Sequence, residues 1–234
     1  MKIYGHRGAA GHVAENTIAS MQRALDLEVD GIEFDVRLSA DGVPVVIHDE
    51  TLDRTTDVRG LVKDYSAAEL SSQTRKAEAN VFVPTQMETL QAIGTEIAVN
   101  VELKELAATE PTRSVLLSAI EQQIVRPEQI IITSFDHDAI TLYRSISQAD
   151  AQQLSVGLLT RGLPDDSYWP LARKVQASSV NIDLGSVDPE FVRRAHARDY
   201  LVMVYTVNTT EDAARMRALK VDAIFSDFLD QVRE

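Results

Sequence analysis

The apolar residues of this chain recur in two patterns that alternate along most of its length. Short runs rich in Val, Ile and Leu predict β-strands, and longer segments with apolar residues three or four positions apart predict helices. The first strand is expected at residues 2–6 and the first helix at residues 14–27. From residue 96 onward, such strands and helices follow one another regularly, which is typical of βα units.

The stretch from residue 31 to residue 49 carries the most informative pattern. Apolar residues alternate with Glu33, Asp35 and Arg37, so the three charged side chains share one face of a predicted strand. Two carboxylates on one strand face repel each other unless a cation or a proton lies between them. The usual reason for such a pair is a hard divalent ion, which prefers oxygen ligands.

The same stretch predicts a β-hairpin. Asp41-Gly42 is a tight-turn dipeptide, and an apolar run at residues 43–47 follows it. A two-residue loop would set His48 opposite Asp35, and a four-residue loop would set it opposite Glu33. Either register places an imidazole beside the carboxylate pair.

Residues 50–84 have no clear period, apart from a short predicted helix at 66–69 whose sequence has capping-box form. We expect this segment to form a small insertion, or cap, over one end of the fold. The remaining strands are expected at 96–104, 130–135, 155–160, 179–184, 201–207 and 223–227, and the remaining helices at 85–93, 111–124 and 165–176 and after caps at Asp136, Asp188 and Asn208.

The number of strands predicts the fold class. Nine apolar runs qualify as strands, and the run at 43–48 follows its predecessor too closely for a parallel crossover. The other eight form β/α units in a chain of 234 residues, which predicts an α/β protein with a single TIM (β/α)8 barrel domain over residues 1–234. A doubly wound open sheet is the alternative, but no glycine-rich dinucleotide fingerprint follows the first strand.

Composition narrows the cellular setting and the partners. The chain has no cysteine, which excludes disulfides and thiolate metal sites and suits a reducing compartment. It has no signal-peptide pattern and no apolar segment of the roughly 20 residues that a membrane helix needs. We therefore predict a cytoplasmic protein without membrane insertion. The formal net charge of −13 argues against nucleic acid and anionic lipid as partners, so an anionic substrate would need a locally positive site.

Charged side chains gather at several predicted strand ends, where barrel active sites lie. Any one of them has a simpler explanation, because a lone carboxylate pair is usually a solvated strand face and a lone histidine is usually structural. Inward charges in a barrel are costly unless they are paired or bound to an ion. Their convergence therefore predicts an active site that contains His6, Arg7, Glu33, Asp35, His48, Glu102 and Lys104.

The sequence also resembles a known family. The motifs that carry the resemblance occur in family order along the whole chain: H-R-G (6–8), E-N-T (15–17), E-F-D-V (33–36), D-G-V-P-V-V-I-H-D (41–49), L-D-R-T-T (52–56), N-V-E-L-K (100–104), T-S-F (133–135), Y-T-V-N (205–208) and V-D-A-I-F-S-D (221–227). On these motifs the chain is identified as a member of the glycerophosphodiester phosphodiesterase family, whose fold is a TIM barrel.

The resemblance implies a reaction and a role for each site residue. It implies hydrolysis of glycerophosphodiesters, such as glycerophosphocholine and glycerophosphoethanolamine, to sn-glycerol 3-phosphate and an alcohol, with one divalent metal ion, Mg²⁺ or Ca²⁺. It further implies that Glu33, Asp35 and Glu102 are metal ligands, that His6 and His48 form the acid/base pair, and that Arg7 and Lys104 contact the phosphate.

Two alternatives share these residues. One is a lysophospholipase D, which would need an exposed apolar rim at the barrel mouth, and residues 50–84 are where it would lie. The other is a catalytically silent module that binds a phosphodiester. The intact histidines and carboxylates favour an enzyme over the silent module.

Overall fold

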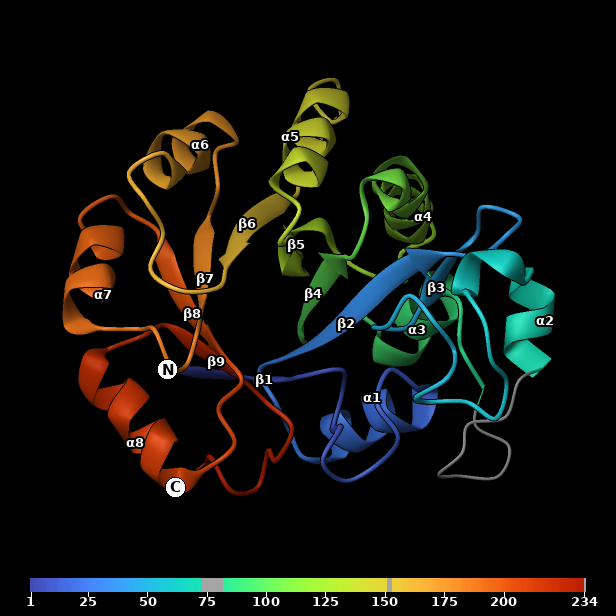
Figure 1. The fold of residues 1–234 in the computed structure, drawn as a ribbon, viewed down its shortest axis with the longest axis horizontal. Helices are drawn as coiled ribbons and strands as arrows, with labels where there is room; N and C mark the ends of the chain where they lie inside the picture. The colour runs from blue at the N-terminus through green and yellow to red at the C-terminus, as the bar shows by residue number, and fades with distance from the viewer. Residues whose placement is uncertain (73–81, 151–152, 234) are drawn as a thin grey trace.

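The structure is a computed structural model that describes residues 1–72, 82–150 and 153–233. Within these residues, parallel strands form a closed barrel, because β1 pairs with both β2 and β9. The predicted TIM barrel is confirmed (Figure 1). Its eight strands are β1 (Lys2–Gly5), β2 (Gly31–Leu38), β4 (Ala98–Leu103), β5 (Ile130–Ser134), β6 (Ser155–Thr160), β7 (Ser179–Asp183), β8 (Leu201–Tyr205) and β9 (Ala223–Ser226).

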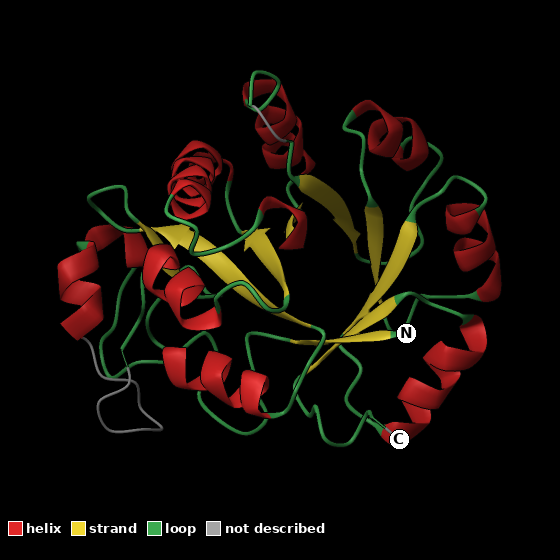
Figure 2. Ribbon diagram, turned by 180° about the vertical axis from the view of Figure 1, so that it is seen from behind, coloured by secondary structure: helices red, strands yellow, loops and turns green. Residues whose placement is uncertain are grey.

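Helices surround the barrel (Figures 1 and 2). The surrounding helices are α1 (Ile18–Asp26), α3 (Gln86–Ile93), α4 (Thr109–Glu121), α5 (His137–Ile146), α6 (Tyr168–Lys174), α7 (Pro189–His196) and α8 (Thr210–Leu219). Short 3-10 turns lie at η1 (Val62–Asp64), η2 (Leu106–Ala108) and η3 (Pro127–Gln129). No helix in the described ranges is long and apolar enough to cross a membrane.

The alternation of the strands separates two environments. The outward residues of β2, among them Ile32 and Phe34, are fully buried in the core between strands and helices. A smaller apolar cluster inside the barrel contains Tyr4, Ile131 and Met203. These residues lie two positions before the inward residues at the carboxyl ends of their strands, so they form an apolar floor beneath the polar end of the barrel.

The hairpin after β2 is present, with a register that differs from both expected ones. β3 (Pro44–Val46) is antiparallel to β2 and lies outside the barrel, with Leu38 opposite Pro44. The Ser39 N–H donates to the Val43 carbonyl over 3.1 Å, which closes a loop of three residues. The loop lengths of two and four residues were therefore wrong. Gly42 has φ +74°, and this left-handed residue is what a three-residue hairpin loop requires.

The three-residue loop also changes the position of His48. The Ile47 N–H donates to the Asp35 carbonyl over 3.1 Å, so Ile47 rather than His48 stands beside Asp35 in the backbone ladder. His48 follows the end of β3, and its side chain nonetheless reaches the carboxyl end of the barrel.

Two helix starts also differ from expectation. The first helix begins at Ile18 rather than at residue 14, because Thr17 is its N-cap and accepts from the Ser20 N–H over 3.1 Å. The last begins after Thr209, whose hydroxyl accepts from the Asp212 N–H over 3.1 Å. Asn208 is therefore not the cap, and its side chain binds elsewhere, as described below.

The expected insertion has a small core of its own. Residues Val45, Ile47, Leu52, Val62, Leu70 and Val83 pack together in it. The short helix predicted at 66–69 is present as α2 (Ala67–Ser72), which lies outside the ring of helices beside β3 (Figure 1). Ser66 and Glu69 exchange capping hydrogen bonds at its start. Residues 73–81 of the insertion lie outside the described residues.

Candidate active site

A cavity of about 150 Å³ lies at the carboxyl ends of the barrel strands. All the predicted site residues except Asp35 line it, and Asp35 lies beneath them, 1% exposed and in contact with Arg7 and Lys104. Phe135 and Tyr205 form part of the opposite wall, with their rings edge to face. The structure thus brings together residues from the ends of most of the barrel strands and from the hairpin.

Three carboxylates meet at the base of this cavity. Glu33 and Asp35 project inward from β2, and Glu102 projects from the neighbouring β4, opposite Asp35 in the strand register. One oxygen of each lies within 4.8 Å of the others. Glu33 Oε1 is buried, and none of the described residues donates a hydrogen bond to it. An unpaired acceptor among three buried carboxylates matches what a hard divalent cation binds, so these residues could hold a metal ion.

The charges of this cluster are not balanced by the protein alone. Burial, together with the charge of Asp35, raises the pKa of Glu33 to about 8. The same two causes raise the pKa of Glu102. Burial would also raise the pKa of Asp35, but the charges of Lys104 and Arg7 outweigh it and lower this pKa to about 2. The cluster therefore needs a proton or a cation in addition to Lys104 and Arg7.

The two cations are held directly against the carboxylates. Lys104 Nζ lies 2.5 Å from Glu102 Oε1 and 3.4 Å from Asp35 Oδ1. Arg7 Nε lies 3.4 Å from Asp35 Oδ2. The Arg7 backbone has φ +54°, a left-handed conformation that is unfavourable for a residue with a Cβ, and its N–H donates to Glu33 Oε2 over 2.7 Å. Strain of this kind at a charged cluster is typical of functional sites.

His6 follows β1 and is oriented by a residue from the far end of the chain. Its Nδ1 lies 2.7 Å from Asp227 Oδ1, and the other oxygen of Asp227 accepts from Asn208 Nδ2 over 2.8 Å. Burial lowers the pKa of His6, but the hydrogen bond to Asp227 and the charge of Glu33 outweigh burial and leave the pKa raised.

His48 lies on the hairpin side of the cavity and has a similar partner. Its Nδ1 lies 2.6 Å from Asp49 Oδ1, and its backbone carbonyl accepts from Arg37 Nε over 2.8 Å. Burial lowers the pKa of His48, and the charges of Arg7 and Lys104 act in the same direction. The two histidines therefore differ in proton affinity, although each has a carboxylate at Nδ1.

Several residues at the site had no role in the sequence prediction. Asn16 donates from Nδ2 to Asp35 Oδ2 over 2.8 Å, and Asp227 and Asp49 orient the histidines. Asn16, Asp49 and Asp227 belong to the E-N-T, D-G-V-P-V-V-I-H-D and V-D-A-I-F-S-D motifs quoted above. Their place in these family motifs is the feature of the sequence that could have indicated a role at the site. The other histidines lie elsewhere: His12 contacts Asp230, His137 contacts the Leu159 carbonyl and His196 contacts Asp222, and none of the three lines the cavity.

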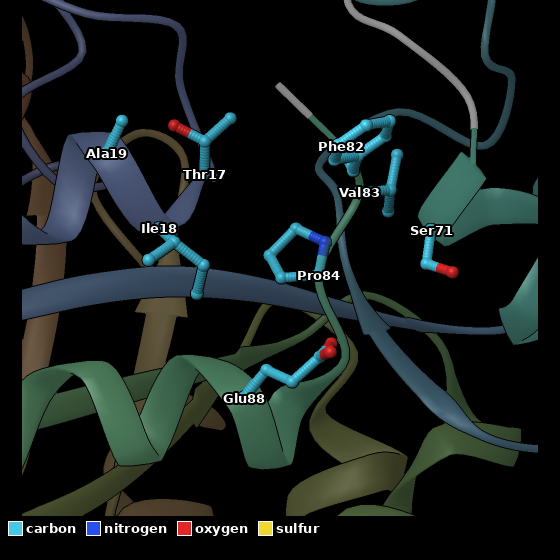
Figure 3. Close-up of a pocket in the computed structure, with 8 residues that line it drawn as sticks. All are labelled: Thr17, Ile18, Ala19, Ser71, Phe82, Val83, Pro84 and Glu88. Atoms are coloured by element: carbon cyan, nitrogen blue, oxygen red, sulfur yellow. The ribbon is translucent and has the colours of Figure 1, made fainter. Parts of the chain in front are cut away.

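A larger groove of about 410 Å³ lies outside the barrel and has a different character. Figure 3 shows its walls, which come from the start of α1, from Ser71 of α2, from residues 82–84 and from the start of α3. Its lining is mostly apolar, with Ile18, Phe82 and Pro84, and it shares no lining residue with the cavity at the strand ends. The smaller cavity, which holds the ionisable groups, is therefore the candidate active site.

Comparisons with known proteins show which family the chain resembles. The model of the glycerophosphoryl diester phosphodiesterase family matches residues 6–231. A glycerophosphodiester phosphodiesterase of Caldanaerobacter subterraneus is 34% identical, with 96% of this chain and 93% of the relative covered. One from Bacillus altitudinis is 31% identical, with 98% and 96% covered. The structure of an Oleispira antarctica phosphodiesterase in complex with the product sn-glycerol-3-phosphate has a TM-score of 0.89 at 26% identity, covering 100% of this chain and 95% of that one.

Proposed function

The chain belongs to the glycerophosphoryl diester phosphodiesterase family and is a phosphodiesterase of that class, and from this premise we propose how it acts and on what. It hydrolyses glycerophosphodiesters, such as glycerophosphocholine and glycerophosphoethanolamine, to sn-glycerol 3-phosphate and the free alcohol. The reaction depends on a divalent ion, Mg²⁺ or Ca²⁺, and uses two histidines for proton transfer.

One observation carries this proposal. Two histidines, each with a carboxylate at Nδ1, line the same small cavity as Arg7, Lys104 and two carboxylates of the cluster, Glu33 and Glu102. Such a cavity offers positive charge for a phosphate and two groups that titrate near neutral pH. The product complex of the Oleispira antarctica protein supports a glycerol phosphate as the bound product.

The cations and the histidines of the cavity have different tasks in the proposed reaction. Arg7 and Lys104 bind the non-bridging oxygens and stabilise the negative charge that grows on them. One histidine removes a proton from the attacking hydroxyl, and the other donates a proton to the departing alcohol oxygen. When the glycerol 2-hydroxyl is the nucleophile, its oxygen bonds to phosphorus as the alcohol leaves, and water then opens the cyclic phosphate.

Glu33, Asp35 and Glu102 would hold the divalent ion, which as a Lewis acid would stabilise charge on the phosphate. Arg7 and Lys104 contact this cluster from the substrate side, so they also limit the repulsion between its carboxylates and an anionic substrate. Without such cations, a protein of net charge −13 would repel a phosphodiester.

The two alternatives predict different products. A lysophospholipase D would release choline from lysophosphatidylcholine, and its acyl chain would need an apolar surface continuous with the cavity. The apolar groove of Figure 3 shares no lining residue with the cavity, so we favour the substrate without an acyl chain. A silent binding module would bind glycerol 3-phosphate without turning over any diester.

The test is an assay of glycerol 3-phosphate release from glycerophosphocholine by metal-loaded and chelator-treated protein. We expect release that chelation abolishes and that added Mg²⁺ or Ca²⁺ restores. A protein with both His6→Ala and His48→Ala controls for contaminating hydrolases. Full activity after chelation would overturn the metal requirement, and turnover of lysophosphatidylcholine alone would favour the lysophospholipase.

A further inference from the structure

Arg54 lies between two carboxylates that come from distant parts of the chain. Its Nε and Nη2 donate to Asp49 over 2.6 and 3.0 Å, and its Nη1 and Nη2 donate to Glu15 over 2.7 and 2.8 Å. One guanidinium therefore binds both oxygens of each carboxylate. Glu15 is in the loop between β1 and α1, and Asp49 follows the hairpin, so Arg54 connects these two segments.

Each of these carboxylates also contacts a predicted site residue. Glu15 Oε1 accepts from Arg7 Nη1 over 2.8 Å, and Asp49 Oδ1 lies 2.6 Å from His48 Nδ1. We propose that Arg54 is a positioning residue, which fixes Arg7 through Glu15 and His48 through Asp49 and so sets the distance between the phosphate-binding group and one proton-transfer group. This role rests on the proposed function of the cavity.

The exposure of Arg54 argues against a purely stabilising role. Its side chain is 47% exposed, and exposed ion pairs contribute little to folding because water screens them. The contact instead fixes the orientation of the two carboxylates. A planar guanidinium holds them in defined directions, which a lysine ammonium cannot do. The hydrogen bonds from Arg54 also lower the pKa of Asp49, which keeps this carboxylate charged beside His48.

Arg7 has a particular need for such support. Its backbone is held in the left-handed region, and its buried Nε donates no hydrogen bond to any of the described residues and only approaches Asp35 Oδ2 at 3.4 Å. The contact from Glu15 to Nη1 is therefore what directs the far end of the guanidinium. If Glu15 moved, Arg7 would lose its direction while keeping its charge.

The experiment compares Arg54→Lys and Arg54→Gln with a matched control at Arg193. Arg193 makes a similar two-bond contact with Glu190 on the exposed face of α7, away from the cavity. For Arg54→Gln we expect kcat/KM for glycerophosphocholine to fall about 10- to 100-fold, as displacements of the order of 1 Å cause. Arg193→Gln should retain wild-type kcat/KM, and the two variants should have similar melting temperatures.

Arg54→Lys separates positioning from charge. The lysine keeps the positive charge but not the fork, so a positioning role predicts that this variant loses most of the activity that Arg54→Gln loses. Binding of glycerol 3-phosphate, measured by calorimetry, should weaken about three- to tenfold in both variants, because Arg7 is no longer directed at the phosphate. The apparent pKa of the pH–rate limb that reports on His48 should change in both variants, whereas the apparent pKa of the limb that reports on His6 should not.

Coupling between the three residues completes the test. We expect Arg54→Gln to cost little further activity once Glu15→Gln and Asp49→Asn are present, because the contacts it provides are already gone. Wild-type kcat/KM and product affinity in Arg54→Lys would overturn the positioning role, and so would full additivity of the substitutions. A wild-type protein that hydrolyses no diester would instead contradict the proposed function, while product binding could still be compared.

Discussion

At the scale of single residues, the two histidines have the same kind of partner and different surroundings. Asp227 and Asp49 each lie at Nδ1, which leaves Nε2 of each ring for proton transfer. Each ring has a carboxylate and Arg7 near it: at His6 the hydrogen bond to Asp227 and the charge of Glu33 outweigh burial and Arg7, whereas at His48 burial, Arg7 and Lys104 outweigh Asp35. The pKa of His6 is therefore raised, and that of His48 is lowered. Near neutral pH these directions favour a protonated His6 and a neutral His48.

This difference predicts a bell-shaped dependence of kcat/KM on pH. Activity should fall at low pH as His48 gains a proton, and at high pH as His6 loses one. His6→Ala and His48→Ala should each cost roughly 10²–10⁴-fold with glycerophosphocholine. With a p-nitrophenyl diester, whose leaving group needs no proton, only the variant that lacks the acid should recover, and we expect this to be His6→Ala. Recovery of His48→Ala instead would reverse the two roles.

Lys104 offers a second prediction at this scale, because it contacts both Glu102 and Asp35 and its side chain is 10% exposed. Lys104→Met should lower kcat/KM about tenfold or more, because one phosphate contact is lost. In chelator the variant should also melt at a lower temperature than the wild type, since two buried carboxylates lose a cation. Saturating metal should remove most of that difference. A lower melting temperature with normal kinetics would instead indicate a structural lysine.

At the scale of elements, a comparison of two glycines with positive φ distinguishes the effect of backbone conformation from that of steric crowding. Gly8 follows Arg7 with φ +83°, and a Cβ there would lie 2.4 Å from Ser20 Oγ. Gly42 in the hairpin loop has φ +74°, with no atom within 4 Å of a Cβ position. Both positions disfavour other residues, but only Gly8 is also crowded against α1.

The corresponding alanine substitutions should therefore differ. Gly42→Ala should lower the free energy of unfolding by about 1 kcal/mol and leave kcat/KM unchanged. Gly8→Ala should destabilise the protein more and reduce kcat/KM, because the loop that holds Arg7 must move away from Ser20. Denaturant unfolding and steady-state kinetics on both variants check this. Equal losses of stability would show that strain alone matters at Gly8.

The elements that the sequence predicted well are those with a clear period. The alternation of β2 placed Glu33 and Asp35 on the inner face, and the structure confirms it. The hairpin register was missed because one loop residue reverses the outcome, and Asp41-Gly42 fits loops of several lengths. The residue type of Asn208 predicts a helix cap, whereas its side chain donates a hydrogen bond to Asp227, which a local pattern does not reveal.

At the scale of the whole molecule, the barrel explains which site residues were predictable. Parallel strands bring their carboxyl ends to one rim, so charged residues at these ends converge whatever their sequence separation. The same rule covers His6 and Asp227, which are 221 residues apart but follow the paired strands β1 and β9 at adjoining positions. The contact between Arg54 and Glu15 has no such rule, because both residues lie in loops. Their pairing depends on how loops fold over the rim, which no periodicity encodes.

The barrel also links the carboxylate cluster to the stability of the whole fold. Glu33 and Asp35 on β2 and Glu102 on β4 are buried together only when these strands pair, so unfolding exposes all three to water. In the metal-free protein the pKa of Glu33 is raised from 4.5 to about 8. Between these values the folded state binds more protons than the unfolded state. The free energy of unfolding should therefore fall as pH rises through this window.

The prediction is that chelator-treated wild type melts several degrees lower at about pH 8 than at about pH 5.5. Saturating Mg²⁺ or Ca²⁺ should raise the melting temperature and weaken this pH dependence, because the ion replaces the proton between the carboxylates.

Glu33→Gln cannot titrate, so its metal-free melting temperature should vary less with pH and should exceed that of the wild type at high pH, while its activity is lost. Glu190→Gln, on the exposed face of α7, controls for the removal of one charge from an acidic protein. The melting temperatures are measured by calorimetry in chelator. If they depend equally on pH in Glu33→Gln and in the wild type, Glu33 is not the carboxyl whose pKa is raised in the cluster.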